Sequence, residues 1–198
     1  MARCSARALS SETLRVGPSR VPSRSKMIAF AMASHLTFAG TVHVQPEPIK
    51  RSRFYGDGSP AGDTSEAMAF VETIRAKYSD ARHHCFAWRL GPGDQGFRVN
   101  DAGEPGGTGG QPILNHIDGA NLRGVVIVVT RYFGGIKLGK GGLIRAYGGT
   151  AGEAIAQANV IKVQETEPLN ITTTYTDQGS VEGVLRSFDL RATDAEYG

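Results

Sequence analysis

One short segment, residues 125–130, constrains the fold more than any other part of the sequence. Every side chain of residues 125–129 is apolar, without the alternation of a strand that turns one face to water. A run of this length between turn residues predicts a strand that is buried on both faces. It is also far too short to span a bilayer. We therefore expect Val125–Thr130 to be the central strand of a sheet.

The sequence on either side of this strand predicts alternating strands and helices. Asp63 and Glu66 have the spacing of a helix N-cap and its capping box. Pro112 suits a first helical turn, and Gly119 ends that helix. We expect helices at 63–78, 112–119 and 142–158, and strands at 35–44, 49–55, 82–89 and 97–100. Helices that cover one face of a sheet give the expected fold class, an α+β two-layer sandwich.

The third of these helices has a stripe of mostly small side chains that we expect to face the sheet. Small residues allow a helix and a sheet to approach closely. The expected stripe consists of Ile144, Gly148, Ala151, Ile155 and Ala158.

Composition divides the chain into four parts. Residues 1–31 are rich in Arg, Ser and Ala, which is typical of a mitochondrial-type presequence or of a disordered or wrongly assigned start. The main domain is expected at 32–158 and a polar linker at 159–168. Residues 169–198 have the pattern strand, helix, strand. Such a piece buries little apolar surface, so we interpret it as the first half of a small domain whose remainder is missing.

Cysteine content and charge exclude several classes of protein. Cys4 and Cys85 stand alone without a CxxC motif, which excludes a disulfide framework and fits a reducing cytoplasm. The first 26 residues hold six basic side chains and one acid and therefore carry a net charge of +5. The whole chain carries +3, so the remaining residues carry −2. Nucleic-acid binding would therefore need a local basic patch.

The segment 130–147 provides such a patch. Five basic residues and no acid lie between Arg123 and Arg145. Glycines let backbone N–H groups approach an anion, and a helix N-terminus adds partial positive charge. We expect phosphate or RNA binding here, with Tyr132 and Phe133 as surfaces that stack on a base. The alternative is a tight turn with solvated basic side chains. The candidate binding residues are Arg131, Tyr132, Gly134, Gly135, Lys137, Gly139, Lys140 and Arg145.

The same segment nearly matches a P-loop. The spacing from Gly134 to Gly139-Lys140 agrees with that motif, but Gly141 stands where a P-loop needs Ser or Thr to hold magnesium. No NTPase activity is therefore expected, although phosphate binding without hydrolysis is compatible with the loop.

A second glycine-rich loop, residues 101–110, carries Asp101 and Glu104. Two carboxylates in such a loop suit acid–base or metal chemistry. We favour a hydrogen-bonded turn, in which Asp101 caps local amides and Thr108 caps the following helix.

A thiol beside two histidines, His83-His84-Cys85, suggests a nucleophilic site. Neighbours on a strand point to opposite faces, so His84 and Cys85 cannot form a dyad with each other. We expect His83 or Cys85 to be a core group and His84 to face the glycine loops. We expect no metal site and no cofactor.

Three segments together resemble the IMPACT/YigZ family: DARHHCFAW (80–88), DAGEPGGTGGQPIL (101–114) and VVTRYFGGIKLGKGGLIRAYG (within 125–148). The resemblance is close over about 48–160 and implies that 32–158 is an Impact N-terminal-type domain with a ribosomal protein S5 domain 2-like fold. The part from Leu169 resembles that family's second domain, which is ferredoxin-like and similar to domains of elongation factor G. The leader is extra to this pattern, and the second domain breaks off at Gly198.

The resemblance also implies a function. Eukaryotic members regulate translation by limiting activation of a kinase that phosphorylates an initiation factor, and an RNA or ribosome role in bacterial members is inferred from the fold. We expect a cytoplasmic, non-enzymatic, translation-associated protein that binds RNA, the ribosome or a translation-related protein. Two alternatives stay open: an enzyme acting on a phosphorylated small molecule or nucleotide, and a module that docks an acidic protein surface.

Overall fold

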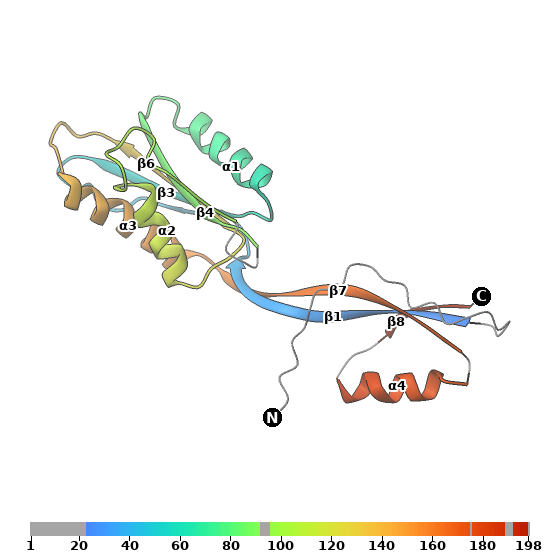
Figure 1. Cartoon of the computed structure of the whole chain (residues 1–198). Coiled ribbons are helices and arrows are strands. Elements are labelled where there is room, and N and C mark those ends of the chain that lie inside the picture. The colour runs from blue at the N-terminus through green and yellow to red at the C-terminus, as the bar shows by residue number, and fades with distance from the viewer. Residues whose placement is uncertain (1–22, 92–95, 175, 189–191, 198) are drawn as a thin grey trace. The chain divides into compact units, whose positions relative to one another are not determined.

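The computed structural model describes residues 23–91, 96–174, 176–188 and 192–197, which belong to two compact units. The larger unit, Ala31–Thr166, contains a five-stranded antiparallel sheet in the order β2-β3-β6-β4-β5 (Figure 1). Its strands are β2 (Val42–Val44), β3 (Arg53–Pro60), β4 (His83–Arg89), β5 (Phe97–Asn100) and β6 (Val125–Tyr132). The predicted central strand is therefore confirmed.

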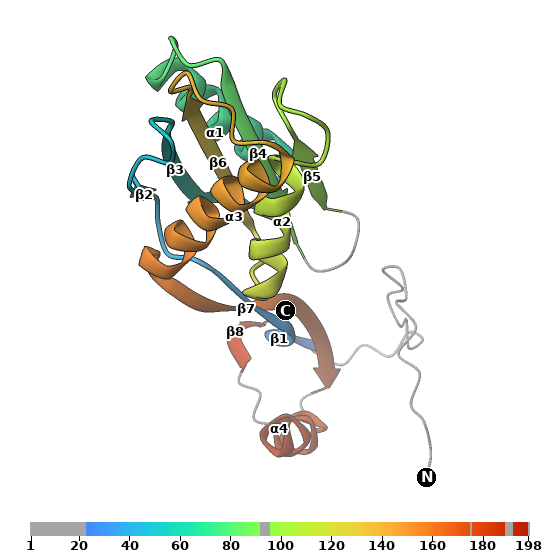
Figure 2. The ribbon, with the colours of Figure 1, turned by 90° about the vertical axis from the view of Figure 1, so that its left-hand side faces the viewer.

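Helices cover both faces of this sheet. On strand β6, Val126 and Val128 pack in one core cluster with α1 (Thr64–Lys77). Val125, Ile127 and Val129 pack in a second cluster with α2 (Gly110–Gly119) and α3 (Lys140–Gln157). Figures 1 and 2 show α1 on one face and the other two helices opposite. The two-layer prediction is wrong, because a strand that is apolar on both faces needs cover on both.

Helix α1 begins where the sequence predicts. The carboxylate of Asp63 accepts a hydrogen bond from the backbone N–H of Glu66 at 2.8 Å. The Glu66 carboxylate accepts in turn from the backbone N–H of Gly62 at 2.7 Å. The first bond satisfies an amide group that the first helical turn leaves unpaired, and the second ties the residue before the N-cap to that turn.

Helix α3 buries most of the predicted stripe, since Gly148 and Ala151 are buried and Ile155 and Ala158 pack against the core, but the prediction for Ile144 is wrong. Ile144 is 44% exposed, whereas Leu143 and Tyr147 are buried. Sequence reasoning placed the apolar Ile144 inward, but burying Leu143 and the large Tyr147 ring turns Ile144 outward. The small residues do allow close packing, since a methyl group on Gly148 would lie 3.0 Å from the imidazole Nε2 of His116 on α2. Gly148 therefore brings the two helices together.

The second unit consists of residues up to Phe30 and from Glu167 onward. It contains helix α4, strand β8, and the parts of β1 and β7 that lie outside residues 31–166; these strands form a three-stranded sheet in the order β7-β1-β8. Their bounds are β1 (Ser23–Phe38), β7 (Val160–Thr174), α4 (Gln178–Ser187) and β8 (Ala192–Tyr197). Within the predicted leader, residues 1–22 lie outside the described part and 23–31 are strand. The predicted linker is also strand, from Val160.

The predicted leader and the predicted linker both contain strand for the same reason. Strand pairing supplies backbone partners to segments whose own sequence has little strand periodicity. The names S5 domain 2-like and ferredoxin-like remain predictions for the two units. Within the described residues, no helix is both long enough and apolar enough to cross a membrane.

Candidate nucleic-acid interface

Strand pairing brings the predicted segments together at one end of the five-stranded sheet. Arg53 of β3 pairs with Tyr132 of β6, and His83 of β4 pairs with Arg131. Two hollows open here, of about 450 and 460 Å³. Both are lined by His83, Arg131 and Phe133. We call the first the arginine hollow, because Arg51, Arg53 and Arg82 also line it, and the second the glycine-loop hollow, because Lys137, Leu138, Gly139 and Lys140 line it.

Arg131 lies beneath both hollows in a buried ion pair. Its Nη1 donates to Glu104 Oε1 at 2.6 Å, and the two side chains are 6% and 5% exposed. The Tyr147 hydroxyl donates to the same carboxylate oxygen at 2.8 Å. The Arg131 guanidinium also lies between the rings of Phe54 and Phe133, 5.7 and 5.3 Å from their centroids. Because Glu104 balances its charge, Arg131 is a structural support and not the free phosphate-binding cation that we expected.

The carboxylates of the 101–110 loop are both engaged in the fold. Asp101 accepts from the backbone N–H groups of Gly107, Gly109 and Gly110 at 2.8, 2.8 and 2.9 Å. Partial burial raises the pKa of Asp101, but these three donors outweigh it and hold the pKa below its usual value. The predicted hydrogen-bonded turn is therefore present, and Glu104 faces Arg131 instead of solvent.

Thr108 does not cap the helix as predicted. Its hydroxyl donates to the carbonyl oxygen of Pro105 at 2.6 Å, and the N-cap of α2 is Gly109, which has no side chain to cap with. The Asp101 carboxylate performs this task from a distance by accepting the first amides of the helix. A side chain at Gly109 would overlap Cys85, so only glycine fits between the loop and β4.

The structure corrects our placement of His84. Its Nδ1 lies 3.1 Å from Thr130 Oγ1, and burial lowers its pKa. Thr130 and His84 follow the register of Val128 and Phe86, which pack on the α1 face. His83 faces the glycine loop instead, and its Nδ1 donates to the Ala102 carbonyl at 3.0 Å.

The Cys85 thiol is a core group without nucleophilic character. It donates to the Asp101 carbonyl at 3.0 Å and is fully buried. Burial raises its pKa to about 12, so the thiol stays protonated at neutral pH.

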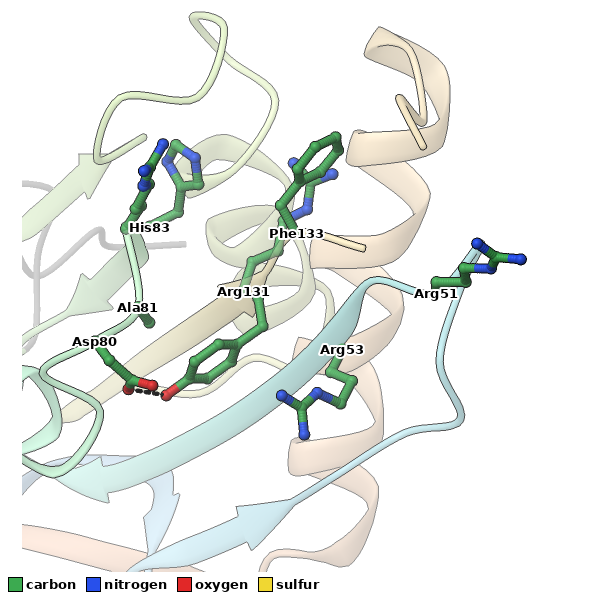
Figure 3. A pocket seen from close by; sticks show the side chains of 9 residues that line it. Arg51, Arg53, Asp80, Ala81, His83, Arg131 and Phe133 are labelled. Atoms are coloured by element: carbon green, nitrogen blue, oxygen red, sulfur yellow. Dashed lines mark hydrogen bonds between the residues drawn. The ribbon is translucent and has the colours of Figure 1, made fainter. Parts of the chain in front are cut away.

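Of the two predicted stacking residues, the structure leaves Phe133 open and engages Tyr132. The Tyr132 hydroxyl donates to Asp80 at 2.5 Å (dashed line in Figure 3), which raises its pKa to about 12. The Arg53 guanidinium lies over the Tyr132 ring, 5.2 Å from its centroid. Phe133 is 55% exposed.

A strained turn carries basic side chains to the arginine hollow. Ile49 and Ser52 exchange two backbone hydrogen bonds of 2.9 Å around Lys50 and Arg51, whose φ angles of 47° and 66° are left-handed. Such tight turns normally favour Asn and Gly, because other side chains are strained there. Ser52 Oγ accepts from the backbone N–H of Gly134 at 3.2 Å, which ties the turn to the glycine loop.

The predicted glycine loop is open around its lysines. Lys137 and Lys140 are exposed. Gly135 and Gly139 have φ angles of 86° and 72°, which favour glycine, and a side chain on either would meet no neighbouring atom. Arg145 is exposed further along α3 and does not line either of the two hollows.

The charge around the two hollows is mainly positive. The exposed cations that line them are Arg51, Arg53, Arg82, Lys137 and Lys140. The lining acids, Asp80 and Glu104, are each bound to a neighbouring side chain. Sequence reasoning missed Arg51, Arg53 and Arg82 as site residues, although the cluster of basic residues at 50–53 was a usable signal. Among the residues that the structure describes, no group of three or more His, Cys, Asp or Glu side chains could hold a metal ion.

Comparisons with known proteins match nearly the same part of the chain as the three motif segments. The Impact N-terminal domain family matches residues 50–155. The IMPACT family member YigZ of Escherichia coli is 38% identical over 84% of this chain and 82% of its own length. An IMPACT family member of Thermus thermophilus is 42% identical over 74% of this chain and 79% of its own.

A solved structure agrees with this similarity. The crystal structure of a hypothetical protein is 35% identical, with a TM-score of 0.63 over 84% of this chain and 82% of the other. Family match, identity and coverage agree, and the chain belongs to the IMPACT family.

Proposed function

We propose that this protein binds RNA of the translation machinery through the arginine and glycine-loop hollows, without catalysing a reaction. The observation that carries the proposal is the set of five exposed cations around the two hollows. Of the two lining acids, Glu104 is paired with Arg131 and Asp80 accepts from the Tyr132 hydroxyl, so the cations outnumber the negative charge. A surface of this kind attracts polyanions, because each phosphate contact releases counterions. We expect the protein to act in the cytoplasm, where ribosomes are available.

The carboxylates and the thiol near the hollows already have partners within the fold, which supports a binding role over an enzymatic one. Asp101 is held by three amides, and Glu104 is paired with Arg131. Cys85 keeps its proton at neutral pH. A general base or nucleophile needs a free group with a pKa near the working pH. The candidates that the sequence suggested lack this property.

An enzyme acting on a phosphorylated small molecule is the second candidate. It is supported by the glycine-loop hollow itself, where Lys137, Gly139 and Lys140 border the start of α3. Helix N-termini bind phosphate groups readily. Magnesium–ATP would then raise the melting temperature of the wild-type chain but not of Lys140→Gln.

The link to translation rests on the family. The resemblance implies translational regulators among eukaryotic members, and the basic hollows provide a surface for the RNA that dominates ribosomes. A translation-related protein with an acidic face is the competing partner, and nuclease treatment of a captured complex distinguishes the two.

Salt dependence of RNA binding tests the proposal. Fluorescence anisotropy with a labelled RNA should give a logarithmic affinity that falls linearly with the logarithm of salt concentration. We expect Arg53→Gln and Lys140→Gln each to reduce that slope by roughly 0.7, the value for one single-stranded phosphate contact. Lys162→Gln removes an exposed cation outside both hollows and serves as the control. Equal slopes in all four proteins would contradict the proposal.

A further inference from the structure

Phe133 occupies the boundary between two hollows of different chemistry. It is 55% exposed and lines both. On one side lie Arg51, Arg53 and Arg82, and on the other lie Pro105, Leu138 and Leu143 with two lysines. Phosphates suit the first side, and a flat apolar group suits the second. A ligand that spans both therefore combines phosphates with a planar ring.

The Phe133 ring is held in place from below. The Arg131 guanidinium lies 5.3 Å from the ring centroid, and Arg131 is itself fixed by Glu104. In Figure 3 the Phe133 ring overlaps the Arg131 guanidinium, and the His83 ring lies to the left of both. His83 is held by its hydrogen bond to Ala102. Two rings that the fold already holds in place at one opening form a stacking surface. Binding a base there loses little additional side-chain entropy.

The volume of the glycine-loop hollow limits what can enter. At about 460 Å³ it has the size of a small-molecule pocket, which accommodates a single base and its sugar. Bases inside a duplex are stacked on each other and cannot enter such a recess, whereas unpaired bases can be splayed out and stacked on aromatic side chains. Lys137 and Lys140 are exposed beside the hollow and suit the flanking phosphates.

We infer that the glycine-loop hollow takes one unpaired base of single-stranded RNA, stacked on Phe133, while the arginine hollow holds the neighbouring phosphates. This inference rests on the proposed function and deepens it, because it names the strandedness of the RNA. The positive charge alone attracts single and double strands alike. Phe133 is then the residue that selects single strands.

Two aromatic variants and one matched control test the inference. Phe133→Leu keeps an apolar side chain and removes the ring, and Phe133→Trp keeps a ring. Phe97→Leu is the control, because Phe97 is another exposed phenylalanine, 52% exposed, with the Arg89 guanidinium 5.1 Å from its centroid. Phe97 does not line either hollow. Anisotropy is measured with one labelled RNA strand, alone and annealed to its complement, and melting temperatures confirm that each variant is folded.

We expect Phe133→Leu to weaken single-strand binding by about tenfold, within the range for one stacked base, and to leave duplex binding unchanged. Phe133→Trp should retain single-strand binding, and Phe97→Leu should match the wild type. If Phe133→Leu lost affinity equally for both forms of RNA, or for neither, the inference would be overturned. The proposed function would still stand in that case, provided that the wild type binds RNA in a salt-sensitive way. A wild-type chain that binds neither RNA would overturn both.

Discussion

At the scale of single residues, the centre of the site is a buried polar cluster and not a set of solvated charges. Arg131 and Glu104 form an ion pair that water hardly reaches, and Tyr147 donates to the same carboxylate. Burying a charge is costly unless a partner and hydrogen bonds compensate for it. The cluster therefore fixes the 101–110 loop against β6, and in the proposed function the exposed cations around it are the groups that bind RNA.

Removing one member of this pair should destabilise the fold. We expect Arg131→Met to lower the free energy of unfolding by about 3–5 kcal/mol, because it leaves the Glu104 carboxylate buried without a counter-charge. Urea denaturation followed by circular dichroism measures this change. The double variant Arg131→Met/Glu104→Gln should recover most of the loss. A loss below about 1 kcal/mol in the single variant would mean that the pair is solvated, as surface pairs are.

Sequence reasoning predicted some of these residue roles and not others. Asp101 was predicted correctly because an acid at the start of a glycine-rich loop has free amides within reach. The roles of His83 and His84 were exchanged, because alternation along a strand separates neighbours without indicating which face each one takes. The partner of Arg131 was not predictable, since Glu104 is 27 residues away in the chain.

At the scale of elements, a turn and a loop position the cations of the arginine hollow. The 49–52 turn holds Lys50 and Arg51 in a left-handed conformation that costs about 1–3 kcal/mol for each such residue. A side chain on Gly134 would overlap the backbone of Arg51 and Ser52, so the turn and the glycine loop are in direct contact. The strain is therefore maintained by packing against a glycine.

A single methyl group should separate these two segments. We expect Gly134→Ala to cost about 1–3 kcal/mol of stability through overpacking, and to weaken RNA binding because Arg51 and Arg53 shift away from the hollow. Urea denaturation and anisotropy measure the two effects. Gly40→Ala is the control, because a methyl group at Gly40 would meet no atom within 4 Å. Equal behaviour of the two variants would show that the close contact has no role.

Helices and strands with a clear sequence pattern were predicted correctly, but the arrangement of the helices on the two faces of the sheet was predicted only in part. The buried strand and the capped helix α1 both lie where their patterns indicate. The cover on both faces of the sheet was implied by the apolar run at 125–129, yet we expected helices on one face. The strand predicted from Leu169 is present as the later part of β7, but residues 160–168 were predicted to be a linker. Their side chains do not alternate between apolar and polar, so pairing and not periodicity defines this part of the strand.

At the scale of the whole molecule, net charge conceals the proposed function. The chain carries +3 in total, and the part after residue 26 is net negative. The fold nevertheless gathers five cations from three separate segments around two adjacent hollows. Local potential and not total charge governs the attraction of a polyanion at short range, because salt screens distant charges.

Cosedimentation of the full chain with ribosomes across a salt series tests the central claim most directly. The double variant Arg53→Gln/Lys140→Gln removes one cation from each hollow. The control Lys162→Gln/Arg186→Gln removes two exposed cations elsewhere. We predict that the wild type and the control sediment with ribosomes at low salt and are released as salt rises, and that the first double variant stays in the supernatant. A wild type that remains in the supernatant at low salt, or two double variants that behave alike, would contradict it.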